Sequence, residues 1–132
     1  MDLGIKDRVA LVAASSQGLG KAVAMGLARE GVKLALCARN AQALMATTEE
    51  IATAHNVDIL ANTVDVTNEQ SVRDFAAKVT DRFGKIDICV TNAGGPPAKP
   101  FDATTTDEWR RAVDLNLMST LFLARAVLPG MR

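Results

Sequence analysis

The stretch VALVAASSQGLGKAVAMGLAREG, residues 9–31, joins a short apolar run to an amphipathic segment through a loop with two glycines. The run from Arg8 to Ala14 has the length and the unbroken apolarity of a strand that is buried on both faces. The segment from about Leu19 to Glu30 has apolar residues at helical spacing, and Gly31 ends it. The sequence therefore predicts a strand, a glycine-containing loop and a helix, in that order.

Three further apolar runs predict three more strands. They cover residues 32–38, 58–66 and 85–94, and a proline-rich loop at residues 94–104 follows the last of them. Strands that alternate with helices form a parallel sheet with right-handed crossovers and helices on both faces. The expected fold class is therefore α/β. We expect a parallel sheet of about four strands with helices on both faces.

Capping residues predict where the helices begin. Asn40 is a suitable N-cap for a helix that reaches about His55. Residues 67–70, which begin with Thr and end with Gln, have the spacing of a capping box for the next helix. Residues 105–108, which begin with Thr and end with Glu, have the same spacing and open a long helix over residues 106–128.

Composition limits the kinds of function that the chain can have. The 132 residues are 48% apolar, and 15 basic residues balance 15 acidic ones. This predicts a soluble domain without a nucleic-acid partner, which would need a basic surface. No apolar run approaches membrane-spanning length and no signal peptide is evident, so we expect a cytoplasmic location and no membrane partner. Cys37 and Cys89 are expected to be buried thiols, and no cluster around His55 predicts a metal site.

The loop after the first strand has the composition of a phosphate-binding site. A helix N-terminus carries unpaired N–H groups and a partial positive charge, which attract a pyrophosphate. Gly18 and Gly20 allow backbone to approach the phosphates, and neighbouring polar side chains can donate hydrogen bonds. Ala14 replaces a usual glycine, which matters only if the position needs a positive φ or has no space for a methyl group. The predicted cofactor contacts in this loop are Ala14, Ser15, Ser16, Gln17, Gly18, Leu19 and Gly20.

Motifs in four places resemble those of the short-chain dehydrogenase/reductase family. The loop matches the family fingerprint T-G-x-x-x-G-x-G from residue 15 to residue 20 and departs from it at Ala13 and Ala14. TNAG at residues 91–94 resembles the family motif N-N-A-G after the fourth strand. VDVT supplies Asp65 at the exit of the third strand, and DLNLMST places Asn116 where the family has its catalytic asparagine.

The resemblance covers the whole chain but only about the first half of the family. It implies a Rossmann-type parallel sheet with strand order 3-2-1-4 that is truncated after about four strands. It also implies that residues 1–132 are the N-terminal portion of a single Rossmann domain and that the C-terminal catalytic portion is absent. The broad profile is similar to 3-oxoacyl-acyl-carrier-protein reductases and their relatives. The resemblance also implies a nicotinamide dinucleotide, with Asp65 bonded to the adenine amine and Asn116 holding a water of the proton relay. The other implied cofactor contacts are Val66, Asn92, Ala93 and Gly94.

The end of the second strand indicates which nicotinamide cofactor is bound. An acidic side chain there would bind both ribose hydroxyls and repel a 2′-phosphate. This sequence has CARN, in which Arg39 offers a forked cation suited to a phosphate and Asn40 follows it. Arg39 also lies about twenty residues after the glycine loop, as this role requires. We therefore expect NADP(H) in preference to NAD(H), although an isolated arginine can equally be a solvated loop charge.

The chain lacks a tyrosine, which the family uses as its proton donor. The family's Y-x-x-x-K motif and the serine before it therefore have no counterpart here, and we expect the 132-residue chain alone to be inactive. For the parent protein, the resemblance implies a reductase that interconverts a small carbonyl compound and its alcohol by hydride transfer. An apolar row on the long helix is expected to pack in the core or to join copies in a homo-oligomer; its residues are Val113, Leu117, Leu121 and Leu128.

Two other classes of protein remain open at this stage. The missing tyrosine favours a non-catalytic nucleotide-binding or assembly module for the chain as it stands. A receiver-like signalling domain of the flavodoxin type ranks last, because it needs acidic residues after the first strand to hold a metal ion. Ala13, Ala14 and Ser15 occupy that place here.

Overall fold

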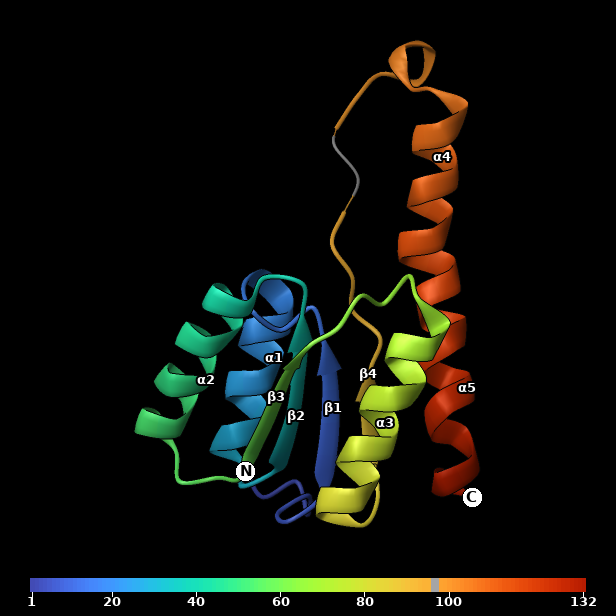
Figure 1. Cartoon of the computed structure of the whole chain (residues 1–132). Helices are drawn as coiled ribbons and strands as arrows, with labels where there is room; N and C mark the ends of the chain where they lie inside the picture. Colours follow the sequence, from blue (N-terminus) through green and yellow to red (C-terminus); the bar gives the residue numbers. More distant parts are fainter. Residues whose placement is uncertain (96–97) are drawn as a thin grey trace.

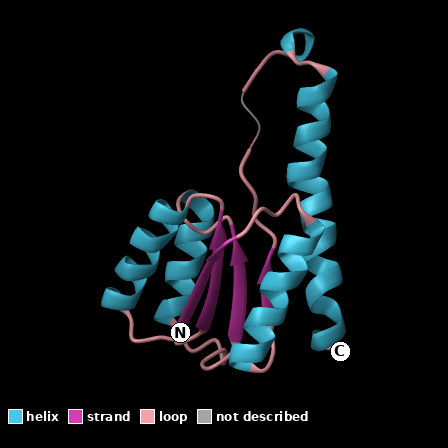
Figure 2. Ribbon diagram, viewed as in Figure 1, coloured by secondary structure: helices cyan, strands magenta, loops and turns pink. Residues whose placement is uncertain are grey.

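The four strands form one parallel sheet. The computed structural model describes residues 1–95 and 98–132. The strand order is β3-β2-β1-β4, as predicted, with every neighbouring pair parallel (Figures 1 and 2). Each strand is shorter than the predicted apolar run at one or both ends. Their bounds are β1 Val9–Ala13, β2 Lys33–Ala38, β3 Ile59–Thr63 and β4 Ile88–Val90.

Helices cover both faces of the sheet, which confirms the predicted Rossmann-type architecture. Helices α1 and α2 lie on one side of the sheet, and α3 and α5 lie on the other (Figure 1). Helix α4 precedes α5 along the chain and extends above the body of the molecule. The bounds are α1 Gly18–Arg29, α2 Ala41–Ala54, α3 Glu69–Phe83, α4 Thr106–Val113 and α5 Ser119–Met131.

The unbroken apolarity of the first strand is explained by two separate cores. Side chains alternate between the two faces of a strand. On β1, Val9, Leu11 and Ala13 pack toward α3 and α5, whereas Ala10 and Val12 pack toward α1 and α2. All five are at most 1% exposed. Both faces of the central strand are therefore closed to water, which leaves only its carboxyl end free to carry a site.

Two of the three predicted helix caps are present, and the third was assigned to the wrong residue. Asn40 caps α2 by accepting a hydrogen bond from the backbone N–H of Ala43 at 3.0 Å. Helix α3 is capped by Asn68, whose side-chain oxygen accepts from the N–H of Ser71 at 3.0 Å. The predicted Thr67–Gln70 capping box is therefore wrong. Thr67 instead donates its hydroxyl to the carboxylate of Asp65, so it is not available to the helix.

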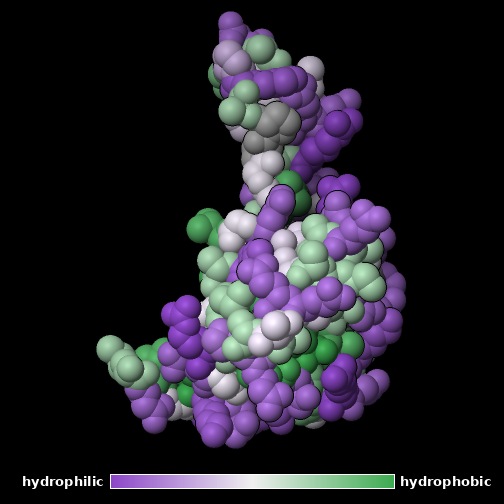
Figure 3. Space-filling model, turned by 90° about the vertical axis from the view of Figure 1, so that its left-hand side faces the viewer, coloured by the Kyte–Doolittle hydropathy of each residue, from purple (hydrophilic) through white to green (hydrophobic). Residues whose placement is uncertain are grey.

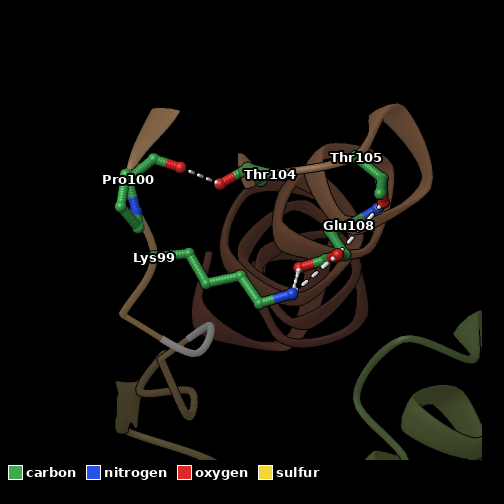
Figure 4. Close-up of polar contacts among 5 residues, drawn as sticks. All are labelled: Lys99, Pro100, Thr104, Thr105 and Glu108. Carbon is green, nitrogen blue, oxygen red and sulfur yellow. Dashed lines mark hydrogen bonds and ion pairs between the residues drawn. The ribbon is translucent and has the colours of Figure 1, made fainter. Parts of the chain in front are cut away.

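The cap of α4 belongs to a small cluster at the tip of the molecule. Thr105 accepts a hydrogen bond from the N–H of Glu108, as predicted, and the Glu108 carboxylate lies 2.9 Å from the ammonium of Lys99 (Figure 4). Next to this cluster, the Phe101 and Trp109 rings meet with centroids 5.9 Å apart. The loop predicted at residues 94–104 contains a 3₁₀ turn, Phe101–Ala103, and its residues 96 and 97 lie outside the described residues.

The long helix predicted from residue 106 is interrupted by a π-helical turn, Asp114–Met118. Its first half stands clear of the body as an arm, whose tip is mostly hydrophilic on the face shown in Figure 3. The predicted apolar row lies on its surface, because each of its four side chains is between 45% and 55% exposed. None of the four side chains is buried in the core of this chain; they are Val113, Leu117, Leu121 and Leu128.

The combined helix Thr106–Met131 is long and apolar enough to cross a membrane by length and composition. This differs from the expectation that no segment approaches membrane-spanning length. Length and composition alone are weak evidence, because a helix that packs against a soluble core meets the same criterion. Here the second half packs on the body through Leu123 and Val127, which are 2% and 4% exposed.

Candidate cofactor-binding site

The residues predicted to bind a cofactor follow the carboxyl ends of the four strands. The glycine loop follows β1, Arg39 follows β2, Asp65 follows β3 and Asn92 follows β4. Because the strands are parallel, these ends meet at one edge of the sheet, where open α/β sheets bind their ligands. The site is therefore a shared edge to which four separate connections contribute.

The first turn of α1 has its backbone N–H groups available for a ligand. The helix begins at Gly18, and its N-cap residue, Gln17, makes no side-chain cap hydrogen bond. There is no acidic side chain in the first turn. Among residues 1–95 and 98–132, no acceptor pairs with the N–H groups of Gly18, Leu19 or Gly20. This helix end can therefore receive an anion by backbone hydrogen bonds and by the helix dipole.

The two loop glycines are required for different reasons. Gly18 has φ +60°, a left-handed conformation that favours glycine. A Cβ on Gly20 would overlap the carbonyl of Ala14 and come within 2.9 Å of the Nδ2 atom of Asn92. We predicted that both glycines allow backbone to approach phosphates. The structure shows that Gly20 also lets the start of α1 pack against the loop itself.

Ala14 occupies a position that does need a positive φ. Its φ is +50°, so the alanine adopts a left-handed conformation that costs about 1–2 kcal/mol in an L-residue with a side chain. Its carbonyl accepts a hydrogen bond from the side chain of Asn92 at 3.3 Å. The loop therefore keeps its path despite the missing glycine, at the expense of local strain.

The two residues after Ala14 are held by other elements of the fold. Ser15 is fully buried, and its N–H and hydroxyl both donate to the carbonyl of Cys37 on β2, at 3.1 and 3.2 Å. The Ser15 hydroxyl thus faces the protein, not the open edge, which differs from the role of donor that we predicted for it. The carbonyl of Ser16 accepts from the hydroxyl of Thr47 on α2 at 2.6 Å.

Sequence reasoning did not identify Thr47. It lies in the middle of an amphipathic helix, where a threonine has no motif around it, and only tertiary structure brings it to the loop. The side chain is 2% exposed, so its hydroxyl has been removed from water to make this contact. Thr47 therefore helps to hold the conformation of the glycine loop.

Arg39 and Asp65 form the electrostatic part of the site. The Asp65 carboxylate accepts hydrogen bonds from the hydroxyl of Thr67 at 2.6 Å and from its N–H at 3.0 Å. These bonds, chiefly the one from the hydroxyl, lower the pKa of Asp65, and the nearby charge of Arg39 lowers it further. Both side chains are exposed. A persistent carboxylate and a cation are therefore present together at the sheet edge.

The remaining predicted contacts are more constrained than the sequence suggested. The side-chain oxygen of Asn40 is used to cap α2, and Val66 is 6% exposed, so mainly its backbone can reach a ligand. Ala93 is half-buried and Gly94 is exposed, both beside Asn92. Asn116 lies in the π turn, with its side chain donating to the carbonyl of Ala112 at 3.0 Å. Turns of this kind occur frequently at functional sites.

A cavity of about 920 Å³ separates the sheet edge from the arm. Arg39 and Thr67 line it from the body, and Trp109, Arg111 and Leu115 line it from the helical arm. Within the described residues, no group of three or more His, Cys, Asp or Glu side chains is placed to hold a metal ion. The edge therefore offers room for an organic ligand next to the Arg39 cation.

A family model described as short chain dehydrogenase matches residues 8–132. The chain belongs to the short-chain dehydrogenase family. An uncharacterized oxidoreductase of Listeria monocytogenes is 36% identical over 126 residues, which cover 96% of this chain and 50% of that protein. A glycine betaine reductase of Emericella nidulans is 36% identical over 127 residues, 96% of this chain and 10% of that protein.

Solved short-chain dehydrogenases share the fold closely. L-Sorbose reductase from Gluconobacter frateurii, complexed with NADPH and L-sorbose, superposes with a TM-score of 0.93 at 34% identity, covering 99% of this chain and 50% of that one. An alcohol dehydrogenase from Thermococcus sibiricus, complexed with 5-hydroxy-NADP, has a TM-score of 0.90 at 32% identity, covering 96% and 54%. Apart from larger proteins such as the betaine reductase, the chain spans about half the length of the curated relatives it matches.

Proposed function

We propose that residues 1–132 are the cofactor-binding N-terminal portion of a single-domain NADP(H)-dependent oxidoreductase. Its reaction is the interconversion of a small carbonyl compound and an alcohol. The bound nicotinamide supplies or accepts the hydride. The glycine loop and the first turn of α1 bind the pyrophosphate, and Asp65 binds the adenine. Family membership favours this function over a non-catalytic nucleotide-binding module.

The observation that carries the choice of cofactor is the exposed Arg39 at the end of β2. No ion pair within the described residues occupies its guanidinium, which leaves the cation available to a 2′-phosphate. Two structural relatives support the proposal, because their crystals contain NADPH or a modified NADP. Arg39 and Asn40 therefore form the proposed subsite for the 2′-phosphate.

Replacement of the Arg39 cation by a carboxylate tests the proposed preference for NADP(H). The Arg39→Asp variant should lose NADPH affinity by at least tenfold and NADH affinity by much less, because only NADPH carries the 2′-phosphate. Fluorescence titration of each nucleotide measures both affinities. Arg29→Asp in the last turn of α1 is the control, since it changes the net charge equally at an exposed site near the opposite end of the sheet. An equal loss of both nucleotides in Arg39→Asp would contradict the assignment to NADP(H).

Catalysis needs a proton donor that these residues do not supply. The family resemblance gives that role to a tyrosine, and this sequence has none, so we expect residues 1–132 alone to lack reductase activity. Asn116 is the one residue here to which the resemblance gives a catalytic role. In the proposed enzyme it holds a water of the proton relay from its place in the π turn.

We also propose that the exposed apolar row of the long helix joins two copies of the chain. The four half-exposed side chains lie on one helix and offer a surface for self-association. A Leu117→Gln, Leu121→Gln double variant should be monomeric by light scattering at concentrations where the parent chain associates. Arg110→Gln, also on this helix, should associate like the parent.

For localisation, cell fractionation should find the protein in the cytoplasm and not in membranes.

A further inference from the structure

Three successive residues of the glycine loop are each held by a different element. The carbonyl of Ala14 is held from the β4 exit, and the N–H and hydroxyl of Ser15 are held from β2. The carbonyl of Ser16 is held from α2 by the hydroxyl of Thr47, across 31 residues of sequence. The third contact is the shortest of the three, and it is the last one before the chain enters α1.

This contact determines where the following N–H group points. A peptide unit is planar and trans, so its C=O and the next N–H point in opposite directions. With the carbonyl of Ser16 held toward Thr47, the N–H of Gln17 is directed away from α2. The next residue, Gly18, has few conformational restrictions of its own. The orientation of the peptide between Ser16 and Gln17 therefore depends on the Thr47 hydroxyl.

We propose that Thr47 is a positioning residue of the cofactor site. It keeps the loop in the conformation that presents its N–H groups to the pyrophosphate, so that the binding of the cofactor does not have to order the loop. This inference rests on the proposed function, because it assumes that the loop binds a dinucleotide. Thr47 itself is only 2% exposed, so in this role it acts on the cofactor through the loop and not by direct contact.

The neighbouring residue provides a matched comparison. Thr48 is also on α2, and its hydroxyl donates to the carbonyl of Leu44 at 2.8 Å, within its own helix. Replacement of either threonine by valine removes one hydroxyl and one hydrogen bond while keeping the side-chain shape. Only the Thr47→Val variant removes a contact with the loop. Thr47→Ser restores the donor and should restore its effect.

The experiment measures nucleotide binding to four proteins: the parent chain, Thr47→Val, Thr47→Ser and Thr48→Val. The probes are NADPH and 2′-AMP, which contains the adenosine and the 2′-phosphate but no pyrophosphate. Thr47→Val should bind NADPH about three- to tenfold more weakly, the usual effect of one lost hydrogen bond. Its affinity for 2′-AMP should not change. Thr47→Ser and Thr48→Val should bind both probes like the parent chain.

The outcomes separate this inference from the proposed function. Normal NADPH binding by Thr47→Val, or an equal loss of NADPH and 2′-AMP, would overturn the role of Thr47 and leave the proposed function standing. Failure of Thr47→Ser to recover NADPH binding would also overturn it. If the parent chain binds neither probe, the proposed function fails and the inference fails with it.

Discussion

The side-chain amide of Asn92 donates a hydrogen bond to the backbone carbonyl of Ala14, across 78 residues of sequence and at 3.3 Å. This bond joins the exit of β4 to the loop that follows β1. Replacement by Asn92→Asp puts a carboxylate against the carbonyl and should reduce the free energy of unfolding by about 1–2 kcal/mol. Urea denaturation measures the change. Asn56→Asp makes the same chemical change at an exposed loop position and should have little effect.

Gly20 and Gly26, two of the three glycines of α1, should respond in opposite ways to alanine. Gly20→Ala places a methyl group against the Ala14 carbonyl and should destabilise the fold by about 3 kcal/mol or more, because backbone must move. Gly26→Ala has nothing within 4 Å of the new methyl group and should stabilise the helix by about 0.5–1 kcal/mol. Thermal melts of both variants make the comparison. Similar melting temperatures would contradict the close packing at Gly20.

Ala14 offers a stabilising substitution. Ala14→Gly should raise the free energy of unfolding by about 0.5–1 kcal/mol, because relief of the positive φ exceeds the entropy that glycine adds to the unfolded chain. Ala13→Gly, one residue earlier in a buried strand, should lower it by about 1 kcal/mol. Urea denaturation of the two variants tests this difference in sign. A loss of stability in Ala14→Gly would show that the left-handed conformation is not strained.

The pKa of Asp65 should depend on Thr67. In the folded chain it lies below the ordinary value because of the Thr67 hydrogen bonds and the Arg39 charge. A lowered pKa stabilises the fold above the unfolded value of about 3.9, and this contribution is lost as the pH falls through the folded pKa. Thr67→Val should therefore raise the pKa of Asp65, as measured by NMR titration of its carboxyl carbon, and weaken the pH dependence of stability below about pH 4. An unchanged pKa would contradict the role of the hydroxyl.

Both cysteines should be unreactive in the folded protein. Burial raises the pKa of Cys37 to about 12, with a further contribution from Cys89, and burial raises that of Cys89 to about 11. Iodoacetamide at pH 8 should modify them slowly, Cys37 more slowly than Cys89, and quickly in urea, as followed by mass spectrometry. Because unfolded thiols ionise near pH 8.5, stability should fall as the pH rises above that value. Rapid alkylation of native Cys37 would exclude the buried environment.

The sequence predicted those features that local patterns determine. Apolar runs and helical spacing located the four strands, the family resemblance implied their order, and Asn40 and Thr105 cap the helices that they were predicted to cap. The cap predicted at Thr67 was wrong because the next residue, Asn68, is also a good cap residue. The choice between the two was decided by the competing acceptor on Asp65, which lies outside the capping motif.

Features that depend on contacts between distant segments could not be predicted. The positive φ of Ala14 follows from the path imposed by Asn92 and Gly20, not from the alanine itself. From the sequence, the Ser15 hydroxyl is a candidate hydrogen-bond donor to a phosphate. In the structure it donates instead to the backbone carbonyl of Cys37 on β2. The π turn around Asn116 has no local signature, because the residues within it have ordinary helical patterning.

The two hydrophobic cores lie on opposite faces of the sheet and contribute separately to stability. The side chains of β1 that contact α3 and α5 are different from those that contact α1 and α2, and the two groups share only backbone. Substitutions on opposite sides should therefore have nearly additive effects on stability. Thr47 lies on α2, and its hydroxyl holds the loop from that side of the sheet. Natural variation can thus repack the core beneath α3 and α5 while the contact between Thr47 and the glycine loop is kept.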